Sequence, residues 1–291
     1  MKKLIIFLIL LLMPQLVLAS YISLKTTITT NLITDDSSKI EVDILNSGDE
    51  SAFSVQISPL LSSDFQVEPN LYDLGTLDPN EPEKINFDVT LSDGILPGSY
   101  PLVVLVDYAD ANGYPFSSVS PSSIIYKTQT LSKVTGVMEK LDLSKERTQT
   151  LTLTIRNLDQ VQHNVDVKIY LPRELKIDKE ESTVSIGPKE EKNINFEVSS
   201  FSALPGSSYI VLATLDYDDS NSHYSYTARN IINIVKEKPL EFPIWLPILS
   251  FIVLLIIFAY YLIRGKNEGI SRNSNTERRE EPAESAERNK E

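Results

Sequence analysis

Acidic side chains gather in two short turns of this sequence, and they are the first residues whose types and spacing could do chemistry. The candidates are Asp107, Asp110 and Asn112 in the first turn and Asp216, Asp218 and Asp219 in the second. Carboxylate and amide oxygens are the ligands that Ca²⁺ prefers. The spacing, however, does not match the D-x-[DN]-x-[DN]-G loop, and no Glu stands at the place of its bidentate ligand. The favoured role is therefore a hairpin turn, with a low-affinity Ca²⁺ site as the alternative and no other cofactor expected.

Other groups that could carry out catalysis are few. The chain has two histidines, His163 and His223, and no cysteine. Neither histidine has a partner at metal-ligand spacing, no serine lies in a G-x-S-x-G context, and no Gly-rich phosphate loop occurs. We therefore expect that the protein is not an enzyme and has no catalytic residues.

Each of the two acidic turns lies at the end of one copy of a longer repeated motif. The first copy, residues 94–114, reads "GILPGSYPLVVLVDYADANGY", and the second, residues 202–224, reads "SALPGSSYIVLATLDYDDSNSHY". The copies stand about 110 residues apart, which is a common domain size. This repeat predicts two tandem domains, residues 20–130 and residues 131–238.

Apolar and polar residues alternate within each copy, as in "IEVDILN" at 40–46 and "LTLTIRN" at 151–157. Such alternation is typical of half-buried strands in antiparallel sheets. Further strands are predicted at 52–58, 83–90, 98–108 and 114–126 in the first copy and at 161–170, 190–199, 208–217 and 224–235 in the second. Turn clusters such as "NSGDE" and "ADANG" separate these strands. The predicted fold class is all-β, with two tandem immunoglobulin-like antiparallel β-sandwiches that lack the cysteine pair and core tryptophan of antibody domains.

The aromatic residues mostly suit these cores. Phe87 and Phe196 fall at equivalent positions on alternating strands, which predicts core packing. Tyr114, Tyr224 and Tyr226, near the hairpin ends, are better placed for exposed contacts. No Trp occurs between the two ends of the chain, and this disfavours carbohydrate as a partner.

The first 19 residues have the pattern of a secretory signal peptide. Lys2 and Lys3 precede an apolar stretch, and small residues before Ser20 suit a cleavage site. An uncleaved anchor is the alternative.

A second apolar run, residues 243–263, carries no charge. As a helix it would be about 31 Å long, which matches the hydrocarbon core of a bilayer. Its interfacial and flanking anchors are Trp245, Tyr260, Tyr261, Arg264 and Lys266. Basic residues beside a span prefer the cytoplasm, so we expect a single-pass protein of the cell membrane with its ectodomain outside and its C-terminus inside.

Charge and composition limit the remaining possibilities. Residues 264–291 are rich in charges of both signs and nearly free of large apolar side chains, so we expect a disordered cytoplasmic tail. The tail is neutral and Lys2 and Lys3 are positive, so the total charge of −13 leaves about −15 on the region between the ends, which argues against nucleic acid as a partner.

The repeated motifs resemble a known family. The first copy has Asn46-Ser47-Gly48, Leu77-Asp78-Pro79, Pro97-Gly98-Ser99-Tyr100 and Tyr108-Ala109-Asp110-Ala111-Asn112-Gly113. The second copy keeps Asn157, Pro188 and Leu204-Pro205-Gly206 but has Asp159 and Ser222 where turn glycines stood. These motifs resemble the CARDB-type and S-layer-associated immunoglobulin-like β-sandwich repeats of prokaryotic, especially archaeal, cell envelopes. The resemblance covers most of residues 35–235 and implies the fold more than the function.

Two functions follow as expectations. The first is a non-enzymatic envelope protein that displays two sandwiches, stacked end to end as a short rod, for adhesion, surface-layer attachment or scaffolding. The alternative is an accessory subunit of a transporter, secretion or translocation complex, with the sandwiches on its extracytoplasmic face. The expected partners are therefore the membrane and either other envelope proteins or a polytopic membrane complex.

Overall fold

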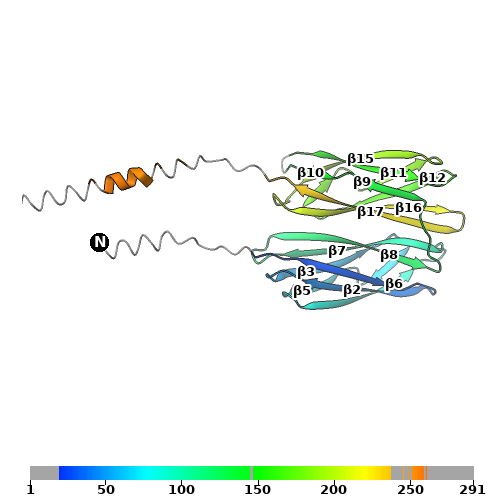
Figure 1. The fold of residues 1–291 in the computed structure, drawn as a ribbon. Coiled ribbons are helices and arrows are strands. Elements are labelled where there is room, and N and C mark those ends of the chain that lie inside the picture. The colour runs from blue at the N-terminus through cyan, green and yellow to red at the C-terminus, as the bar shows by residue number, and fades with distance from the viewer. Residues whose placement is uncertain are drawn as a thin grey trace, which may run out of the picture. The chain divides into compact units, whose positions relative to one another are not determined.

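The structure is a computed structural model that describes residues 20–144 and 147–236, together with residues 245, 249, 251–258 and 260. The chain divides into two units, residues 1–236 and residues 237–291, and each is described by itself. Within the described residues the first unit is built from strands, and it is drawn as the labelled body of Figure 1.

The N-terminal half of the first unit, β1 to β8, forms two facing groups of strands. Its strands are β1 (Leu24–Thr30), β2 (Ser37–Asn46), β3 (Ala52–Leu60), β4 (Phe65–Glu68), β5 (Tyr72–Leu77), β6 (Pro82–Leu91), β7 (Gly98–Ala109) and β8 (Pro115–Tyr126). The outer sheet has the order β1-β2-β6-β4, and the inner group has the order β5-β3-β7-β8. All of these pairings are antiparallel.

The C-terminal half, β9 to β17, repeats this arrangement. Its strands are β9 (Val134–Met138), β10 (Leu141–Leu143), β11 (Gln149–Asn157), β12 (His163–Tyr170), β13 (Leu175–Ile177), β14 (Glu181–Ile186), β15 (Glu191–Ser200), β16 (Ser208–Asp219) and β17 (Ser222–Ile234). The outer sheet is β9-β11-β15-β13 and the inner group is β14-β12-β16-β17. Each strand thus has the same neighbours as its counterpart in the N-terminal half, and only β10, which pairs parallel to β17, is extra.

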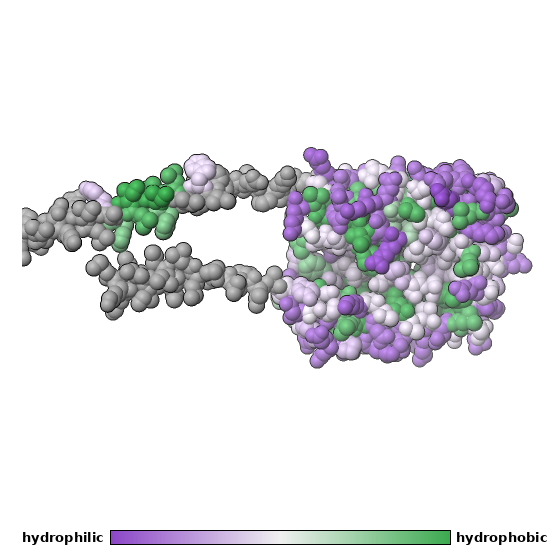
Figure 2. All heavy atoms as spheres, viewed as in Figure 1, coloured by the Kyte–Doolittle hydropathy of each residue, from purple (hydrophilic) through white to green (hydrophobic). Residues whose placement is uncertain are grey.

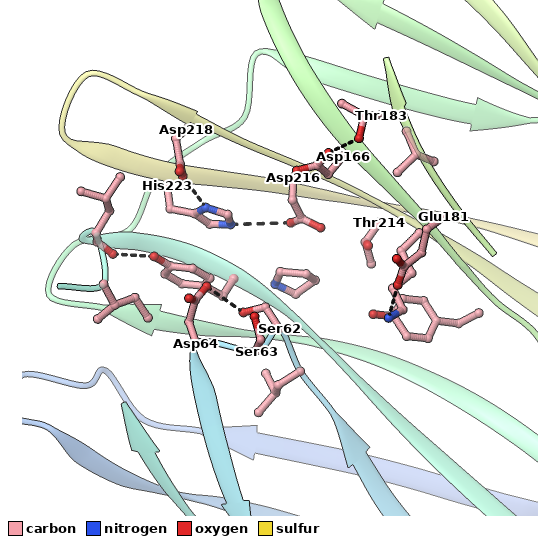
Figure 3. A pocket seen from close by; sticks show the side chains of 18 of the residues that line it. Ser62, Ser63, Asp64, Asp166, Glu181, Thr183, Thr214, Asp216, Asp218 and His223 are labelled. Atoms are coloured by element: carbon pink, nitrogen blue, oxygen red, sulfur yellow. Dashed lines mark hydrogen bonds and ion pairs between the residues drawn. The ribbon is translucent and has the colours of Figure 1, made fainter. Parts of the chain in front are cut away.

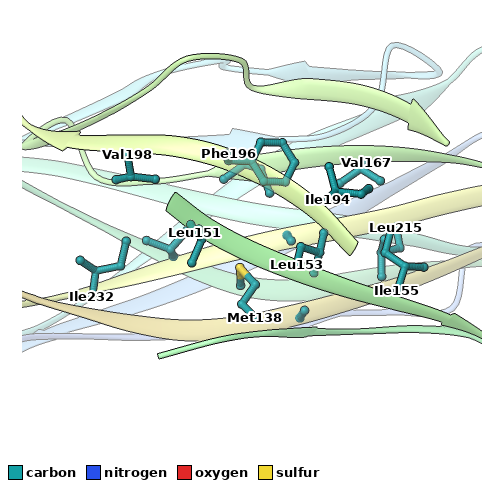
Figure 4. Close-up of a cluster of buried hydrophobic side chains, with 14 of the residues drawn as sticks. Met138, Leu151, Leu153, Ile155, Val167, Ile194, Phe196, Val198, Leu215 and Ile232 are labelled. Carbon is teal, nitrogen blue, oxygen red and sulfur yellow. The ribbon is translucent and has the colours of Figure 1, made fainter. Parts of the chain in front are cut away.

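Each half has its own hydrophobic core, and alternation along the strands builds it. On β2, Ile40, Val42 and Ile44 point inward, and Leu151, Leu153 and Ile155 do the same on β11. The predicted core role of Phe87 and Phe196 is confirmed, because both are fully buried. Figure 4 shows Phe196 above Leu151 and Leu153 in the core of the C-terminal half.

The two halves lie side by side rather than end to end. A parallel bridge between Gly98 of β7 and His223 of β17 joins their inner strands into one nine-stranded sheet. A third apolar cluster of Val103, Val119 and Leu212 lies between the halves, and Figure 1 shows β7 and β8 running beneath β16 and β17. The expected end-to-end rod is therefore wrong, because these strands bury apolar side chains on both of their faces.

The second unit is described only in part. Its described residues are helical, and none of them belongs to a helix that is both long and apolar enough to cross a membrane. Trp245 and Tyr260 are among them, and Figure 2 shows the apolar colour of residues 251–258. The other predicted anchors, Tyr261, Arg264 and Lys266, lie outside the described residues. So do the predicted signal peptide, the tail and part of the predicted span.

Candidate functional site

The repeated LPG motif forms a chain corner that is held by a hydrogen bond to a tyrosine hydroxyl. At the start of β7, the Tyr100 hydroxyl donates to the carbonyl oxygen of Leu96 at 2.7 Å. At the start of β16, the backbone N–H of Leu204 donates to the Tyr209 hydroxyl at 3.1 Å. Each tyrosine therefore fixes the path by which the chain enters the long inner strand of its own half.

The corner of the N-terminal half receives the β16–β17 hairpin of the C-terminal half. The backbone N–H of His223 donates to the Pro97 carbonyl oxygen at 2.9 Å. The His223 ring stacks on the Tyr100 ring with a centroid distance of 3.9 Å and an angle of 2°. A Cβ atom at Gly98 would lie 2.1 Å from the His223 carbonyl oxygen, so this approach requires glycine.

Two carboxylates of β16 flank His223. Its Nδ1 lies 2.7 Å from Asp218 Oδ1, and its Nε2 lies 3.7 Å from Asp216 Oδ1. Burial on its own would lower the pKa of His223, but the neighbouring carboxylates outweigh burial and raise this pKa above 6.5. Burial also raises the pKa of the Asp216 carboxyl above its ordinary value.

These residues line a cleft of about 560 Å³ between the two halves. The N-terminal half contributes Leu61, Ile95 and Tyr100, and the C-terminal half contributes Tyr170 and Thr214 in addition to the carboxylates and His223. Figure 3 shows Asp216, Asp218, His223 and Thr214 on one wall and Ser62, Ser63 and Asp64 opposite. The volume suits a small molecule or a single side chain.

The charged groups of the cleft are mostly satisfied by one another. Lys168 forms an ion pair with Glu181 at 2.6 Å, and Thr183 donates to Asp166 at 2.7 Å. Three polar atoms differ from these. Thr214 Oγ1, Asp216 Oδ1 and His223 Nε2 are buried and have no hydrogen-bond partner among the described residues.

The opposite end of the same interface has a smaller cleft of about 370 Å³, and the charged groups there are paired. Arg173 of the C-terminal half forms an ion pair with Asp107 of β7 at 2.8 Å. Glu174 is fully buried, and both of its carboxylate oxygens accept hydrogen bonds from Ser117, one from the backbone N–H and one from the hydroxyl, each at 2.9 Å. Burial raises the pKa of the Glu174 carboxyl despite these donors. Here the Tyr114 hydroxyl also donates to the Ser202 carbonyl oxygen.

The interface is approximately two-fold symmetric, because equivalent positions of the two repeats take part from both sides. Val103 corresponds to Leu212, and both belong to the apolar cluster between the halves. Asp107 corresponds to Asp216, and each lies near one end of the interface. The residues that pair with these two aspartates differ. Asp107 is paired with Arg173 of the other half, whereas Asp216 is paired with His223 of its own half.

The predicted Ca²⁺ candidates are not gathered into a site. Asp110 accepts hydrogen bonds from the backbone N–H groups of Asn112 and Tyr114, and Gly113 has a positive φ of 76°, as the hairpin interpretation required. Asp107 forms an ion pair with Arg173. Asp218 is hydrogen-bonded to His223, and Asp219 to Ser220. In the part of the chain that the structure describes, no cluster of three metal-ligating side chains is present. Nitrogen and hydroxyl donors thus engage Asp107, Asp110, Asp218 and Asp219, although Asp107 Oδ1 and Asp216 Oδ1 accept no hydrogen bond.

Neither His223 nor Thr214 was predicted as a site residue from the sequence. The hairpin register places Asp218 directly opposite His223, so pairing the strands of the predicted hairpin would have brought them together. The other histidine, His163, is buried against Tyr217 with its Nε2 3.3 Å from Asp159. Tyr114, Tyr224 and Tyr226 are half-buried rather than exposed.

Comparisons with known proteins find only distant similarity. No family model matches the chain, and no curated protein matches it. A protein of unknown function from Porphyromonas gingivalis W83 is similar in structure with 14% identity and a TM-score of 0.31, over 72% of this chain and 99% of that one. The periplasmic chaperone SfaE has 14% identity and a TM-score of 0.27 over 73% and 100%. Alpha-2-macroglobulin of Escherichia coli has 12% identity and a TM-score of 0.30 over 75% of this chain and 22% of that one. Similarities this distant do not specify a function.

Proposed function

We propose that the two halves are tandem immunoglobulin-like sandwiches, residues 20–130 and residues 131–238. The outer order β1-β2-β6-β4 matches the A-B-E-D sheet of such domains, and β8-β7-β3 matches G-F-C. Tyr100 also occupies the place of the tyrosine corner, near the start of the F strand with its hydroxyl bonded to backbone upstream. One further strand, β5 or β14, extends the inner sheet of each half.

We propose that the protein is a non-enzymatic, single-pass envelope protein that holds both sandwiches outside the membrane for adhesion, surface-layer attachment or scaffolding. The apolar N-terminal segment supports export, and the uncharged run at 243–263 with its aromatic and basic flanks supports anchoring. The partners are the membrane and other envelope proteins, and the resemblance to envelope repeats agrees with this role.

The observation that carries the proposal is the interface between the halves. It combines the apolar cluster around Leu212, the Arg173–Asp107 ion pair and the hydrogen bonds of Ser117 to Glu174. The connecting segment is fixed as well, because the Thr130 hydroxyl donates to the His223 carbonyl oxygen at 2.7 Å. Two sandwiches held in this way present one fixed surface, and binding to it costs little conformational entropy.

The side-by-side packing gives specific support to the alternative function. An adhesin gains from reach, whereas two sandwiches packed along their length reach no further than one. Such a body would suit an accessory subunit that covers the extracytoplasmic face of a polytopic membrane complex. We keep this function as a second candidate for that reason.

Mild detergent extraction of the tagged, full-length protein after cross-linking in cells tests both functions. We expect recovery with envelope or surface-layer proteins for the first function and with a polytopic membrane protein for the second. A Leu212→Asp variant should lose the partner, because it separates the sandwiches, while Asp88→Asn, an exposed charge change on β6, should retain it. Recovery of a lone monomer in every preparation would contradict both functions.

A further inference from the structure

The cleft between the halves contains three buried polar atoms that have no hydrogen-bond partner among the described residues, although two of them, Asp216 Oδ1 and His223 Nε2, face each other as a long ion pair. Thr214 is 0% exposed, and its hydroxyl lines the cleft near Tyr170 and Asp216 without a hydrogen bond of normal geometry. Asp216 Oδ1 and His223 Nε2 lie 3.7 Å apart beside it. A buried polar atom without a hydrogen bond costs about 1–3 kcal/mol, so three in one place point to a ligand that supplies the missing partners.

The hydrogen-bonding character of these atoms defines that ligand. The Asp218 carboxylate can only accept, so His223 Nδ1 carries the proton that lies between them at 2.7 Å. When the pH is above the raised pKa of His223 the imidazole is neutral, and Nε2 is then an acceptor; below that pKa the protonated ring pairs with Asp216 instead. Asp216 Oδ1 is an acceptor too, and the Thr214 hydroxyl has free acceptor capacity. The ligand must therefore present several donors at one point.

The surroundings favour a positive charge on those donors. Asp64, Asp166 and Asp218 line the same cleft, and its lysine, Lys168, is already paired with Glu181. A metal ion fits less well, because the described residues hold no cluster of three carboxylate, histidine or cysteine ligands. A primary ammonium group has three N–H donors and a full charge on one atom.

The walls also suit the carbon chain that such a group carries. The Tyr100 ring, stacked on His223, lies beside the polar atoms, and Leu61 and Ile95 continue the wall on the side of the N-terminal half. An alkyl stem can pack on such a surface while its ammonium group reaches the polar end.

We propose that this cleft binds a primary alkylammonium group, from either a free amine or a lysine side chain of another protein, through Thr214, Asp216 and His223. The site goes beyond the proposed envelope function, since it would exist in the double sandwich whatever the chain is attached to. At the other end of the interface the counterpart of Asp216, Asp107, is already paired with Arg173.

Isothermal titration calorimetry on the full-length chain in a non-ionic detergent tests this site. The probes are butylamine, 1,5-diaminopentane and the Nα-acetyl, N-methylamide derivative of lysine, with butyltrimethylammonium as the matched ligand that has charge but no N–H donors. We expect butylamine to bind about tenfold or more tightly than its trimethyl analogue, since hydrogen bonds to charged groups are lost in the latter. This comparison uses the unmodified protein and needs no variant to fold.

Variants then locate the site. Thr214→Val keeps the side-chain shape and should weaken butylamine binding about tenfold, as should Asp216→Asn, whereas Asp88→Asn should leave it unchanged. Tighter binding of diaminopentane than of the lysine derivative would indicate a free amine as the natural ligand, and the reverse would indicate a protein. Absence of amine binding, equal binding of the trimethyl analogue, or tight Ca²⁺ binding that depends on Asp216 would overturn the proposal.

Discussion

Two buried asparagines, Asn46 and Asn157, occupy equivalent positions at the ends of β2 and β11, and each holds a turn together. The Asn157 amide donates to the carbonyl oxygens of Val161 and Gly187, and its Oδ1 accepts from the N–H of Asp159. The residue is fully buried, so water cannot replace these bonds. Both copies have Asn at this position because its amide both donates to and accepts from the backbone of the turn, whereas most surface residues differ between the copies.

We predict that Asn157→Ala lowers the free energy of unfolding by about 2–4 kcal/mol, because the carbonyl oxygens of Val161 and Gly187 and the N–H of Asp159 lose the side chain that holds them together. Chemical denaturation followed by circular dichroism measures the change. Asn193→Ala is the matched control, since this side chain is exposed on β15 and accepts one hydrogen bond from Thr154. Equal effects of the two substitutions would show that the turn does not depend on the buried amide.

His223 makes the stability of the first unit depend on pH, with a sign that follows from its raised pKa. The protonated ring faces Asp216 and Asp218 from β16, with Tyr100 stacked on it from β7. Its contribution is complete below the unfolded pKa of about 6.5 and is lost as the pH rises through the higher folded pKa. We predict that the wild type loses free energy of unfolding over this window and that His223→Gln loses less. Denaturation midpoints measured across this window check the prediction, and identical pH profiles would refute it.

At the scale of elements, β16 contributes side chains both to the core of its own half and to the apolar cluster between the halves. Leu215 points into the core of the C-terminal half, whereas Leu212 points into the cluster between the halves. Both are fully buried, so β16 reads in the sequence as a nearly continuous apolar run. Such a run is typical of a strand covered on both faces.

This arrangement predicts that Leu212→Asp uncouples the two halves. A carboxylate in the cluster between them is desolvated without a partner, so the interface opens while the core of each half is left intact. Calorimetry of the full-length chain in detergent should show one transition for the wild type and two for the variant. Leu215→Ala should instead lower the stability of the C-terminal half by about 2–5 kcal/mol without opening the interface. A single, merely shifted transition for Leu212→Asp would contradict the uncoupling.

The long strands could be predicted from the sequence because their alternation extends over many residues. Strands predicted at 83–90 and 190–199 correspond to β6 and β15, and the other long strands agree equally well. Six further strands were not predicted: β1, β4, β5, β10, β13 and β14. β4, β10 and β13 have only three or four residues and show no period, and β1, β5 and β14 bury few side chains, so their apolar alternation is weak. β9 was not predicted either, because its five residues follow directly on a polar segment.

The candidate site was predictable only in part, and the reason is its position between two repeats. Local patterns located the acidic turn and its hairpin, which β16 and β17 form. They did not reveal that Tyr100, more than a hundred residues upstream, would stack on His223. The continuous apolar runs of β7 and β16 were the available signal, because a strand buried on both faces needs a second covering layer.

At the scale of the whole molecule, the duplication explains more than the number of domains. Each copy of the LPG motif builds a tyrosine corner in its own half and also forms part of the contact with the other half. Because equivalent residues such as Val103 and Leu212 meet across the interface, the contact has the form of a two-fold dimer of sandwiches joined in one chain. The two ends of that contact have diverged, one into an ion pair and the other into the larger cleft.

The proposed orientation in the membrane gives the last prediction, and the absence of cysteine from the chain makes it directly testable. A Ser92→Cys variant places a thiol at an exposed position of the double sandwich, and a Ser271→Cys variant places one in the basic and acidic C-terminal segment. We expect a membrane-impermeant maleimide to label Ser92→Cys on intact cells and to label Ser271→Cys only after the membrane is opened, because basic residues after residue 263 favour the cytoplasmic side. The parent chain has no thiol, so any labelling comes from the introduced residue. Labelling of both positions on intact cells would contradict a single span between them, and labelling of Ser271→Cys alone would reverse the orientation.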